Sequence, residues 1–294
     1  MDFMPNLKLI DSWSQSQESF TQRVEDQIIQ ICNFNPSQKP SFESLNLFLN
    51  NFFKRKSKKV RCKITFECAK SLNIDYEDAV KIAAAVELIH NASILHDKIS
   101  DEFSESIKNK DFVNNNLISG DFLISSAFLL ISSINNSCLG DLIKILSKSI
   151  MVTSIGQIND LSHEQKSFNL NDDLTTFCYK SGSLIVLPIE LCSKLHTTLD
   201  ISNLLLELKF NLGTAYQIAD DIDDIESDLK DNNNNIVIRY CKEHKINNTE
   251  GIAQLQTIAI SNLDQAIQKT SLTNIKIQTT LDQITSYLRV KLQN

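Results

Sequence analysis

An all-α fold is predicted by the scarcity of chain breakers, by long runs of helical periodicity and by an ordinary balance of apolar and charged residues. Six Gly and four Pro make 10 of 294 residues, about 3%, whereas a globular protein averages roughly 12%. A chain of strands would need a turn about every ten residues, and such turns mostly use Gly, Pro, Asn or Asp. The hydrophobic share of 42% and the charged share of 22% exclude collagen-like, mucin-like and disulfide-scaffold proteins. We therefore expect a helical protein large enough to enclose a deep pocket.

The overall charge limits the kinds of partner that are expected, and the cysteines indicate the cellular compartment. A formal net charge of −7 predicts that the protein as a whole repels nucleic acid and anionic membranes. The seven Cys include no CxxC pair and no zinc-type spacing, so they are interpreted as reduced thiols of a cytoplasmic protein. The sequence does not open with a basic region followed by an apolar run, and no stretch approaches about 18 uninterrupted apolar residues, so neither secretion nor a membrane span is expected.

The N-terminal part is expected to form two helices. Apolar residues recur at helical spacing over 18–31, and two prolines in the segment 33–40 end that helix. Ser41 is expected to cap a second helix of Leu and Phe residues. The basic run 54–63 follows it, and this run is the most cationic segment of an acidic protein. An anionic substrate would find local attraction there.

A long helix without Gly or Pro is predicted over 76–101, with Asp75 as its N-terminal cap. The asparagine runs 114–116 and 232–235 are interpreted as low-complexity loops. Because no linker rich in Pro, Gly or Ser interrupts the pattern, we expect a single domain over 1–294, with 1–40 as a peripheral N-terminal helix. Further helices are expected over 118–134, 139–161, 172–194, 202–225, 249–269 and from 275 to the end.

The first of two acidic stripes lies on the predicted helix 76–101. His90, Ile94, Asp97 and Asp101 follow one another at steps of four, three and four, which puts them on one helix face. Two carboxylates one turn apart repel each other. A cation is therefore expected between Asp97 and Asp101.

The second acidic stripe lies toward the end of the predicted helix 202–225. Asp221 flanks it, and the opposite face is apolar. An EF-hand is disfavoured, because its loop needs Gly at the sixth position whereas this segment is strongly helical. The residues of the stripe, at steps of four, three, four and four, are Gly213, Gln217, Asp220, Asp224 and Asp228.

Either stripe alone is also typical of a solvated helix face. Two matched rows of hard carboxylate oxygens instead favour Mg²⁺, which keeps several waters and shares its shell with phosphate oxygens. The implied substrate is a diphosphate, which also needs protein cations. Each candidate cation, taken alone, is also compatible with a solvated or structural side chain. The candidates are Lys58, Lys59, Arg61, His90 and Lys180.

The order of these motifs resembles the trans-type polyprenyl diphosphate synthase family. ELIHNASILHDKISDE resembles its first aspartate-rich motif, and GTAYQIADDIDDIESD resembles its second, DDxxD. KKVRC, ISGDFLISSAF, GQINDL and YKSGSL resemble the family's basic signature, its GD helix, its Gln-Asp helix and its Lys-Thr-Gly segment. The resemblance runs from about residue 57 to 238. It implies the all-α isoprenoid synthase type I fold, a helical bundle around a deep central cavity.

The resemblance also implies the reaction and its residues. Family members are homodimeric, Mg²⁺-dependent prenyltransferases that condense an allylic prenyl diphosphate with isopentenyl diphosphate. The implied metal ligands are Asp97, Asp101, Asp220, Asp221 and Asp224. The implied substrate-binding residues are Lys58, Lys59, Arg61, His90, Lys180, Ser181 and Gln217. The implied catalytic residues are Lys180, Gln217, Asp97 and Asp220.

The sequence departs from the family pattern mainly on the cationic side of diphosphate binding. Lys98 stands where the first motif normally has its second Asp, and the Arg-Arg-Gly that normally follows is missing from 103–115. These departures leave two alternatives open. One is a noncatalytic or regulatory subunit that forms a heterodimer with an active homologue, and the other is a prenyltransferase with another acceptor. A terpene cyclase is disfavoured, because the second motif has Asp where cyclases usually have Asn, Ser or Thr, and Glu.

Overall fold

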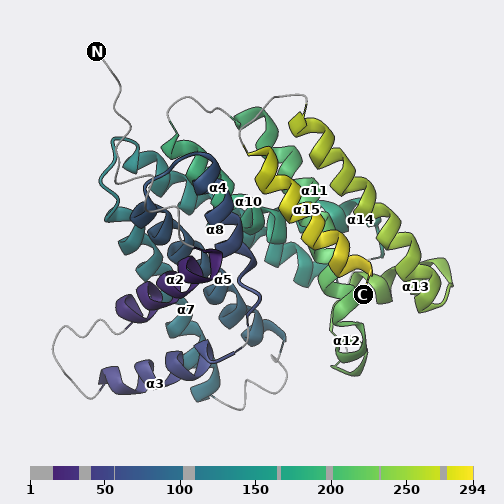
Figure 1. Ribbon diagram of the computed structural model, residues 1–294. Helices are drawn as coiled ribbons and strands as arrows, with labels where there is room; N and C mark the ends of the chain where they lie inside the picture. Colours follow the sequence, from purple (N-terminus) through teal and green to yellow (C-terminus); the bar gives the residue numbers. More distant parts are fainter. Residues whose placement is uncertain are drawn as a thin grey trace. The chain divides into compact units, whose positions relative to one another are not determined.

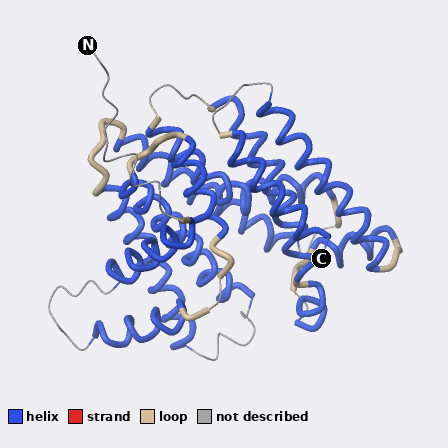
Figure 2. The backbone as a smooth tube through the Cα atoms, viewed as in Figure 1, coloured by secondary structure: helices blue, strands red, loops and turns tan. Residues whose placement is uncertain are grey.

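The computed structural model describes residues 16–32, 41–55, 57–101, 110–163, 167–196, 201–231, 233–271 and 277–293. Within these ranges the backbone forms helices joined by short loops, and no strand (Figure 2). The predicted all-α fold is confirmed. The predicted break over 33–40 and residues 103–109 of the divergent segment lie outside the described residues.

The helices cluster into two compact units, Met1–Lys144 and Ile145–Asn294. Each unit has its own set of buried apolar side chains. The single-domain organisation over 1–294 stays a prediction.

In the first unit, α5 (Tyr76–Asp101) is the central helix. Residues 82–88 of α5 have exposed fractions of only 0–1%, so this stretch is buried on every side. The N-terminal helix contributes to that core, since Phe20 is fully buried. The helices around α5 are α2 (Gln17–Cys32), α4 (Val60–Ser71) and α7 (Lys110–Ser132), with α3 (Ser41–Phe53) on α7 (Figure 1).

The predicted start of α5 is confirmed, whereas the predicted start of α7 is not. Asp75 Oδ1 accepts hydrogen bonds from the backbone N–H groups of Glu77 (3.0 Å) and Asp78 (3.1 Å), so the predicted cap is present. The predicted loop over 114–116 is wrong, because α7 begins at Lys110 and includes these residues. Asn116 is buried there and donates to the carbonyl of Phe112 (2.8 Å), so packing overrides the low helix propensity of Asn.

One described helix, α7, is long and apolar enough to cross a membrane by length and composition alone. In its most apolar window 44% of the residues are buried inside the protein. The buried side of α7 packs on α5, as a core helix does.

In the second unit, α11 (Ser202–Asp223) is the central helix, with α14 (Asn248–Ser271) and α15 (Gln278–Gln293) along it (Figure 1). The predicted apolar face of α11 is confirmed for Leu208, Leu212, Ala215 and Ala219, which are fully buried. The other elements are α8 (Leu139–His163, which enters this unit at Ile145), α9 (Leu170–Phe177), η1 (Cys178–Gly182), α10 (Ser183–Leu195), α12 (Ile225–Asp231) and α13 (Ile236–His244).

The predicted helix over 172–194 is interrupted by a π-helical turn, η1, that contains Lys180. The turn and α11 approach each other backbone to backbone. A Cβ atom on Gly182 would lie 2.0 Å from the carbonyl oxygen of Lys209, and one on Gly213 would lie 2.7 Å from Cα of Gly182. Only glycine permits this approach, which fixes Lys180 and its neighbours beside α11.

The second acidic stripe does not lie on one continuous helix. α11 ends at Asp223, Asp224 caps it with φ −98° and ψ 3°, and Asp228 belongs to α12. The prediction of a single helical face through Asp228 is therefore wrong. Carboxylates are favourable at a helix N-terminus and unfavourable at a C-terminus, so Asp224, directly before Ile225, favours the start of α12.

Candidate functional site

The first unit gathers basic side chains around His90. This residue is half-buried on α5, and Arg61, Arg55 and Lys59 lie close enough to repel a proton on its ring. Burial, together with these three cations, lowers the pKa of His90 well below its ordinary value. His90 is therefore neutral at neutral pH, and the Arg and Lys side chains supply the positive charge of this cluster.

Arg55, which the sequence patterns did not single out, is held at two points. Its guanidinium lies 3.8 Å from the centroid of the Phe52 ring, and its Nη2 donates to Oδ1 of Asn91 (3.4 Å). Asn91 in turn donates to the carbonyl of Glu87 (2.7 Å) on the preceding turn of α5. These contacts hold Arg55 against α5 near His90.

The remaining basic residues come from the segment that leads into α4. Lys59 has the left-handed backbone value φ 50° before the first turn of α4, and its ammonium lies 3.5 Å from the carboxylate of Glu25. Arg61 is only 4% exposed, whereas Lys58 is exposed. The predicted residues Lys59, Arg61 and His90 are thus neighbours, and Lys58 lies on the outer side of the same segment.

The first aspartate motif occupies the last turns of α5. Asp97 is half-buried, and Asp101 is the final residue of the helix, with its side chain outside the described part of the structure. Lys98, the residue that replaces a family Asp, has its ammonium 5.9 Å from the centroid of the Phe52 ring. The substitution therefore adds a cation next to Asp97 in sequence.

A glycine on α7 supports this end of α5. The ring of His96 lies against Gly120, where an added Cβ would be 2.2 Å from His96 Nε2. The same Nε2 lies 3.7 Å from Oδ1 of Asp121. The GD pair noticed in the sequence thus makes room for His96, the residue before Asp97.

In the second unit, Lys180 is held by an acidic partner. Its ammonium lies 2.6 Å from Oδ2 of Asp160 on α8. The other carboxylate oxygen of Asp160 accepts a hydrogen bond of 2.8 Å from Nδ2 of Asn234. The predicted asparagine loop therefore positions Asp160, which positions Lys180.

A second chain of hydrogen bonds joins Ser181 to the DDxxD motif. Ser181 Oγ hydrogen-bonds to Oε1 of Gln217, whose Nε2 donates to Oδ1 of Asp221 (2.7 Å). Oδ2 of Asp221 accepts from the backbone N–H of Ile236 (2.8 Å) at the start of α13. Burial raises the pKa of Asp221 to about 7, although these hydrogen bonds oppose the rise. Both oxygens of Asp221 are engaged by the protein, which favours a structural role for this carboxylate.

The outer carboxylates of the motif face one cation from α15. Lys291 Nζ hydrogen-bonds to Oδ1 of Asp220 and lies 3.2 Å from Oδ2 of Asp223. Burial opposes the charge of Lys291, but Asp220 and Asp223 together raise its pKa. Burial and the neighbouring charge of Asp220 raise the pKa of Asp224. The motif thus carries more negative charge than Lys291 offsets.

No group of three or more His, Cys, Asp or Glu side chains that could hold a metal ion occurs among the residues that the structure describes. Two carboxylates of the second motif that could supply oxygen donors are Asp220, whose side chain is 40% exposed, and Asp224, at the end of α11. A metal ion here would need further ligands from its substrate or from water, as Mg²⁺ usually has.

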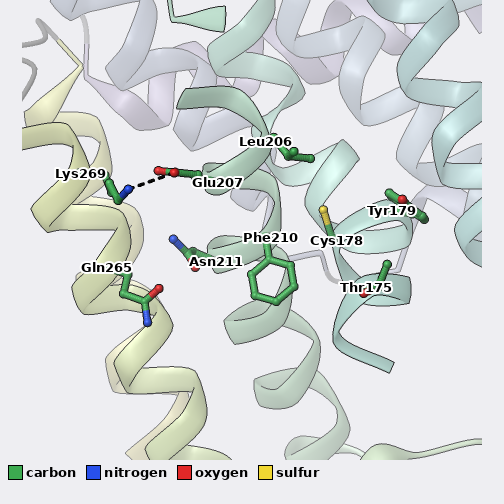
Figure 3. Close-up of a pocket in the computed structure, with 9 residues that line it drawn as sticks. All are labelled: Thr175, Cys178, Tyr179, Leu206, Glu207, Phe210, Asn211, Gln265 and Lys269. Atoms are coloured by element: carbon green, nitrogen blue, oxygen red, sulfur yellow. Dashed lines mark hydrogen bonds and ion pairs between the residues drawn. The ribbon is translucent and has the colours of Figure 1, made fainter. Parts of the chain in front are cut away.

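A pocket of about 370 Å³ lies between η1, α11 and α14 (Figure 3). An ion pair of 3.0 Å between Lys269 and Glu207 spans the space between α14 and α11 in this view. None of the residues predicted from the sequence lines the pocket. Its lining consists of Thr175, Cys178, Tyr179, Leu206, Glu207, Phe210, Asn211, Gln265 and Lys269.

Comparison with solved structures defines the class of the fold. The chain superposes with a TM-score of 0.76 and 20% identity on a geranylgeranyl pyrophosphate synthetase from the archaeon Geoglobus acetivorans, covering 94% of this chain and 99% of that one. A decaprenyl diphosphate synthase from Rhodobacter capsulatus gives a TM-score of 0.76 at 18% identity, covering 97% and 99%. The fold is that of the isoprenoid synthases.

Sequence comparison identifies the family. A family model described as polyprenyl synthetase matches residues 42–248. The chain is 29% identical over 189 residues to a farnesyl diphosphate synthase of Buchnera aphidicola, covering 59% of this chain and 64% of that protein. It is 30% identical over 164 residues to a short chain isoprenyl diphosphate synthase of Methanocaldococcus jannaschii, covering 53% and 50%. The chain thus spans about half to two thirds of the length of these curated relatives. It belongs to the polyprenyl synthetase family.

Proposed function

We propose that this protein is a Mg²⁺-dependent prenyltransferase that joins an allylic prenyl diphosphate to isopentenyl diphosphate. The observation that carries the proposal is the hydrogen-bonded convergence of separate segments in the second unit, where Lys180, Ser181, Gln217 and Asp221 form linked contacts beside Asp220. Membership of the polyprenyl synthetase family supports the same reaction class. The products are a longer trans-polyprenyl diphosphate and pyrophosphate.

In the proposed reaction the C–O bond of the allylic diphosphate breaks, and the double bond of isopentenyl diphosphate attacks the allylic cation. A C–C bond forms, and a proton is lost to the released pyrophosphate. Lys180 donates to the departing diphosphate, since its ammonium is oriented by Asp160. Gln217 and Ser181 line the reacting centre. A dry apolar environment protects the cation from water.

Magnesium is proposed to be held by Asp97 and Asp101 of the first motif and by Asp220 and Asp224 of the second. The fit on the second motif is supported by the raised pKa of Asp224, which reflects burial and uncompensated negative charge nearby. When bound, Mg²⁺ neutralises the charge that develops on the leaving diphosphate. Asp221 is proposed to hold the loop before α13 instead of the metal, because both of its oxygens accept protein hydrogen bonds.

Isopentenyl diphosphate is proposed to bind the basic cluster of the first unit. Lys59, Arg61 and the newly identified Arg55 supply charge, and Lys58 lies on the exposed side of the same segment. His90 contributes a neutral ring that can donate one hydrogen bond to a phosphate oxygen.

The assembly is proposed to be a homodimer. An apolar stripe on α8 supports this, because Met151 (64%), Ile155 (50%) and Ile158 (66%) are exposed at steps of four and three. The seven cysteines form no disulfide, which supports a reducing, cytoplasmic compartment.

The test is elongation by the purified chain with Mg²⁺, labelled isopentenyl diphosphate and allylic diphosphates of graded length. We expect labelled product that disappears with EDTA, returns with Mg²⁺ and is lost in Asp220→Ala. A noncatalytic subunit remains the second candidate, because Lys98 places a cation in the first motif. Silence with every allylic substrate, combined with tight binding to an active homologue, would favour that candidate.

A further inference from the structure

Lys291 occupies a position where the sequence pattern of α15 calls for an apolar residue. The helix buries Leu281, Ile284 and Leu288 at steps of three and four, and the next step along that face is Lys291. Its side chain is only 6% exposed. A buried ammonium is costly unless carboxylates pair with it, so this position requires acidic partners.

The partners are carboxylates at the C-terminal end of α11, the helix along which α15 lies (Figure 1). The ammonium hydrogen-bonds to Asp220, lies 3.2 Å from Asp223 and lies 5.5 Å from the centroid of the Tyr216 ring. The carboxylates are 40% and 34% exposed. The cation is thus buried on the protein side, while its partners stay open to solvent.

We propose that the ammonium of Lys291 is the counter-ion of Asp220 in the metal-free protein and that it leaves Asp220 when a divalent metal ion binds there. Metal binding thereby releases the last turn of α15 from Asp220. The inference rests on the proposed metal role of Asp220. An ammonium and a metal ion compete for the oxygens of one carboxylate, and the two cations repel each other at contact distance. The solvent-facing side of Asp220 gives the metal ion its approach.

The first test is Mn²⁺ titration by isothermal calorimetry, without substrate, on the full chain and on Lys291→Gln. We expect the variant to bind Mn²⁺ more tightly, on the order of tenfold, because one competing and repelling charge is removed. Lys291→Arg keeps that charge and is expected to bind as weakly as the wild type. Arg289→Gln is the matched control, because Arg289 lies on the same helix and pairs with Asp264 instead of the motif.

The inference is overturned by equal or weaker Mn²⁺ binding to Lys291→Gln. Absence of Mn²⁺ binding to both proteins overturns it as well. The Mn²⁺ measurement does not depend on catalysis. If Lys291→Gln binds Mn²⁺ more tightly but the wild type never elongates a prenyl chain, the inference about Lys291 holds and the proposed function is refuted. If the wild type elongates normally but Lys291→Gln has unchanged Mn²⁺ affinity, the proposed function holds and the inference about Lys291 is refuted.

A second measurement uses only the wild-type protein, so that it stands even if the substitution impairs folding. Amine acetylation by a water-soluble ester, followed by mass spectrometry, reports how accessible each lysine is. Saturating Mn²⁺ is expected to increase the labelling rate of Lys291 several-fold, because its ammonium loses Asp220. Lys269, which pairs with Glu207 away from the motif, serves as the internal control. An unchanged or reduced labelling rate at Lys291 would refute the displacement of Lys291 from Asp220 by metal.

Discussion

Asp160 on α8 holds the ammonium of Lys180. One of its oxygens holds the ammonium at 2.6 Å, and the other is held by Asn234 at 2.8 Å. A carboxylate fixed at both oxygens cannot rotate, so the ammonium has a defined location. Positioning of this kind supplies catalysis by keeping a charge near the atom where charge develops.

Asn234→Ala should therefore reduce elongation without unfolding the protein. We expect kcat to fall about tenfold, because small displacements of a positioned charge are costly, with the unfolding midpoint nearly unchanged. Asn233→Ala is the matched control, since Asn233 lies in the same loop but donates to Asp228 (3.3 Å). Steady-state kinetics of both variants distinguish the contact of Asn234 with Asp160 from the contact of Asn233 with Asp228. Equal activity of Asn234→Ala and wild type would refute the positioning of Lys180 through Asp160.

His90 should make stability depend on pH. Its pKa is well below the ordinary value in the folded protein, mainly through burial and then through Arg61, Arg55 and Lys59, whereas in the unfolded chain it lies near ~6.5. Below that pH the unfolded chain takes up a proton that the folded protein does not, so stability is lost as the pH falls, at up to about 1.4 kcal/mol per pH unit. Urea denaturation at pH 7.5, 6.5 and 5.5 should show this loss in the wild type and a smaller one in His90→Gln. Parallel curves for the two proteins would contradict it.

For single residues, the sequence indicated which side chains belong to the candidate site better than it indicated which residues they contact. Gln217 and Asp220 stood out because they follow one another at helical spacing, and Lys180 stood out as a cation in a segment that resembles a family motif. Asn234 was interpreted only as part of a loop, because its role depends on Asp160, 74 residues away. Lys291 had a local signal, a lysine in the register of a buried stripe, but its partners came from another helix.

Among the elements, η1 owes its place to two glycines whose contact with each other the sequence patterns do not predict. Gly182 and Gly213 face each other, and each is too close to backbone atoms to carry a side chain. π-helical turns occur often at functional sites, where they redirect side chains. Here the turn brings Ser181 to Gln217.

Gly182→Ala should destabilise the fold by about 3 kcal/mol, because a methyl group overpacks against the Lys209 carbonyl. Gly140→Ala is the matched control. Apart from its chain neighbours and its own helix backbone, nothing lies within 4 Å of its added Cβ, so the usual helical gain of up to about 0.5–1 kcal/mol is expected. Urea unfolding of both variants checks this, and a neutral Gly182→Ala would contradict the close approach of η1 and α11.

Two of the long helices were predicted closely, and the short ones were not predicted. α5 and α14 have many turns of periodic sequence, and their observed ends lie within about two residues of the expected ones. α12 has seven residues and α13 has nine, too few turns for periodicity to stand out. α13 depends on tertiary contacts, because Asn235 caps it and also donates to the Asp221 carbonyl (2.7 Å).

For the molecule as a whole, the net charge of −7 repels the anionic diphosphates that are proposed as substrates. Local cations offset this repulsion, namely the basic cluster at His90 in the first unit and Lys180 in the second, together with the metal ions proposed for the aspartate motifs. The all-α fold could be predicted from composition and helical periodicity, because so few Gly and Pro disfavour most other architectures. The proposal that elongation requires both aspartate motifs is the one on which the proposed function depends most.

The most direct test compares elongation by wild type, Asp97→Asn and Asp220→Asn, one substitution in each motif, with Asp264→Asn as the control. Asp264 is 65% exposed and pairs with Arg289. The account predicts that the wild type and Asp264→Asn extend an allylic diphosphate with isopentenyl diphosphate, while each motif variant loses at least about a hundredfold in kcat/KM. Full activity in either motif variant, or no elongation by the wild type, would contradict it.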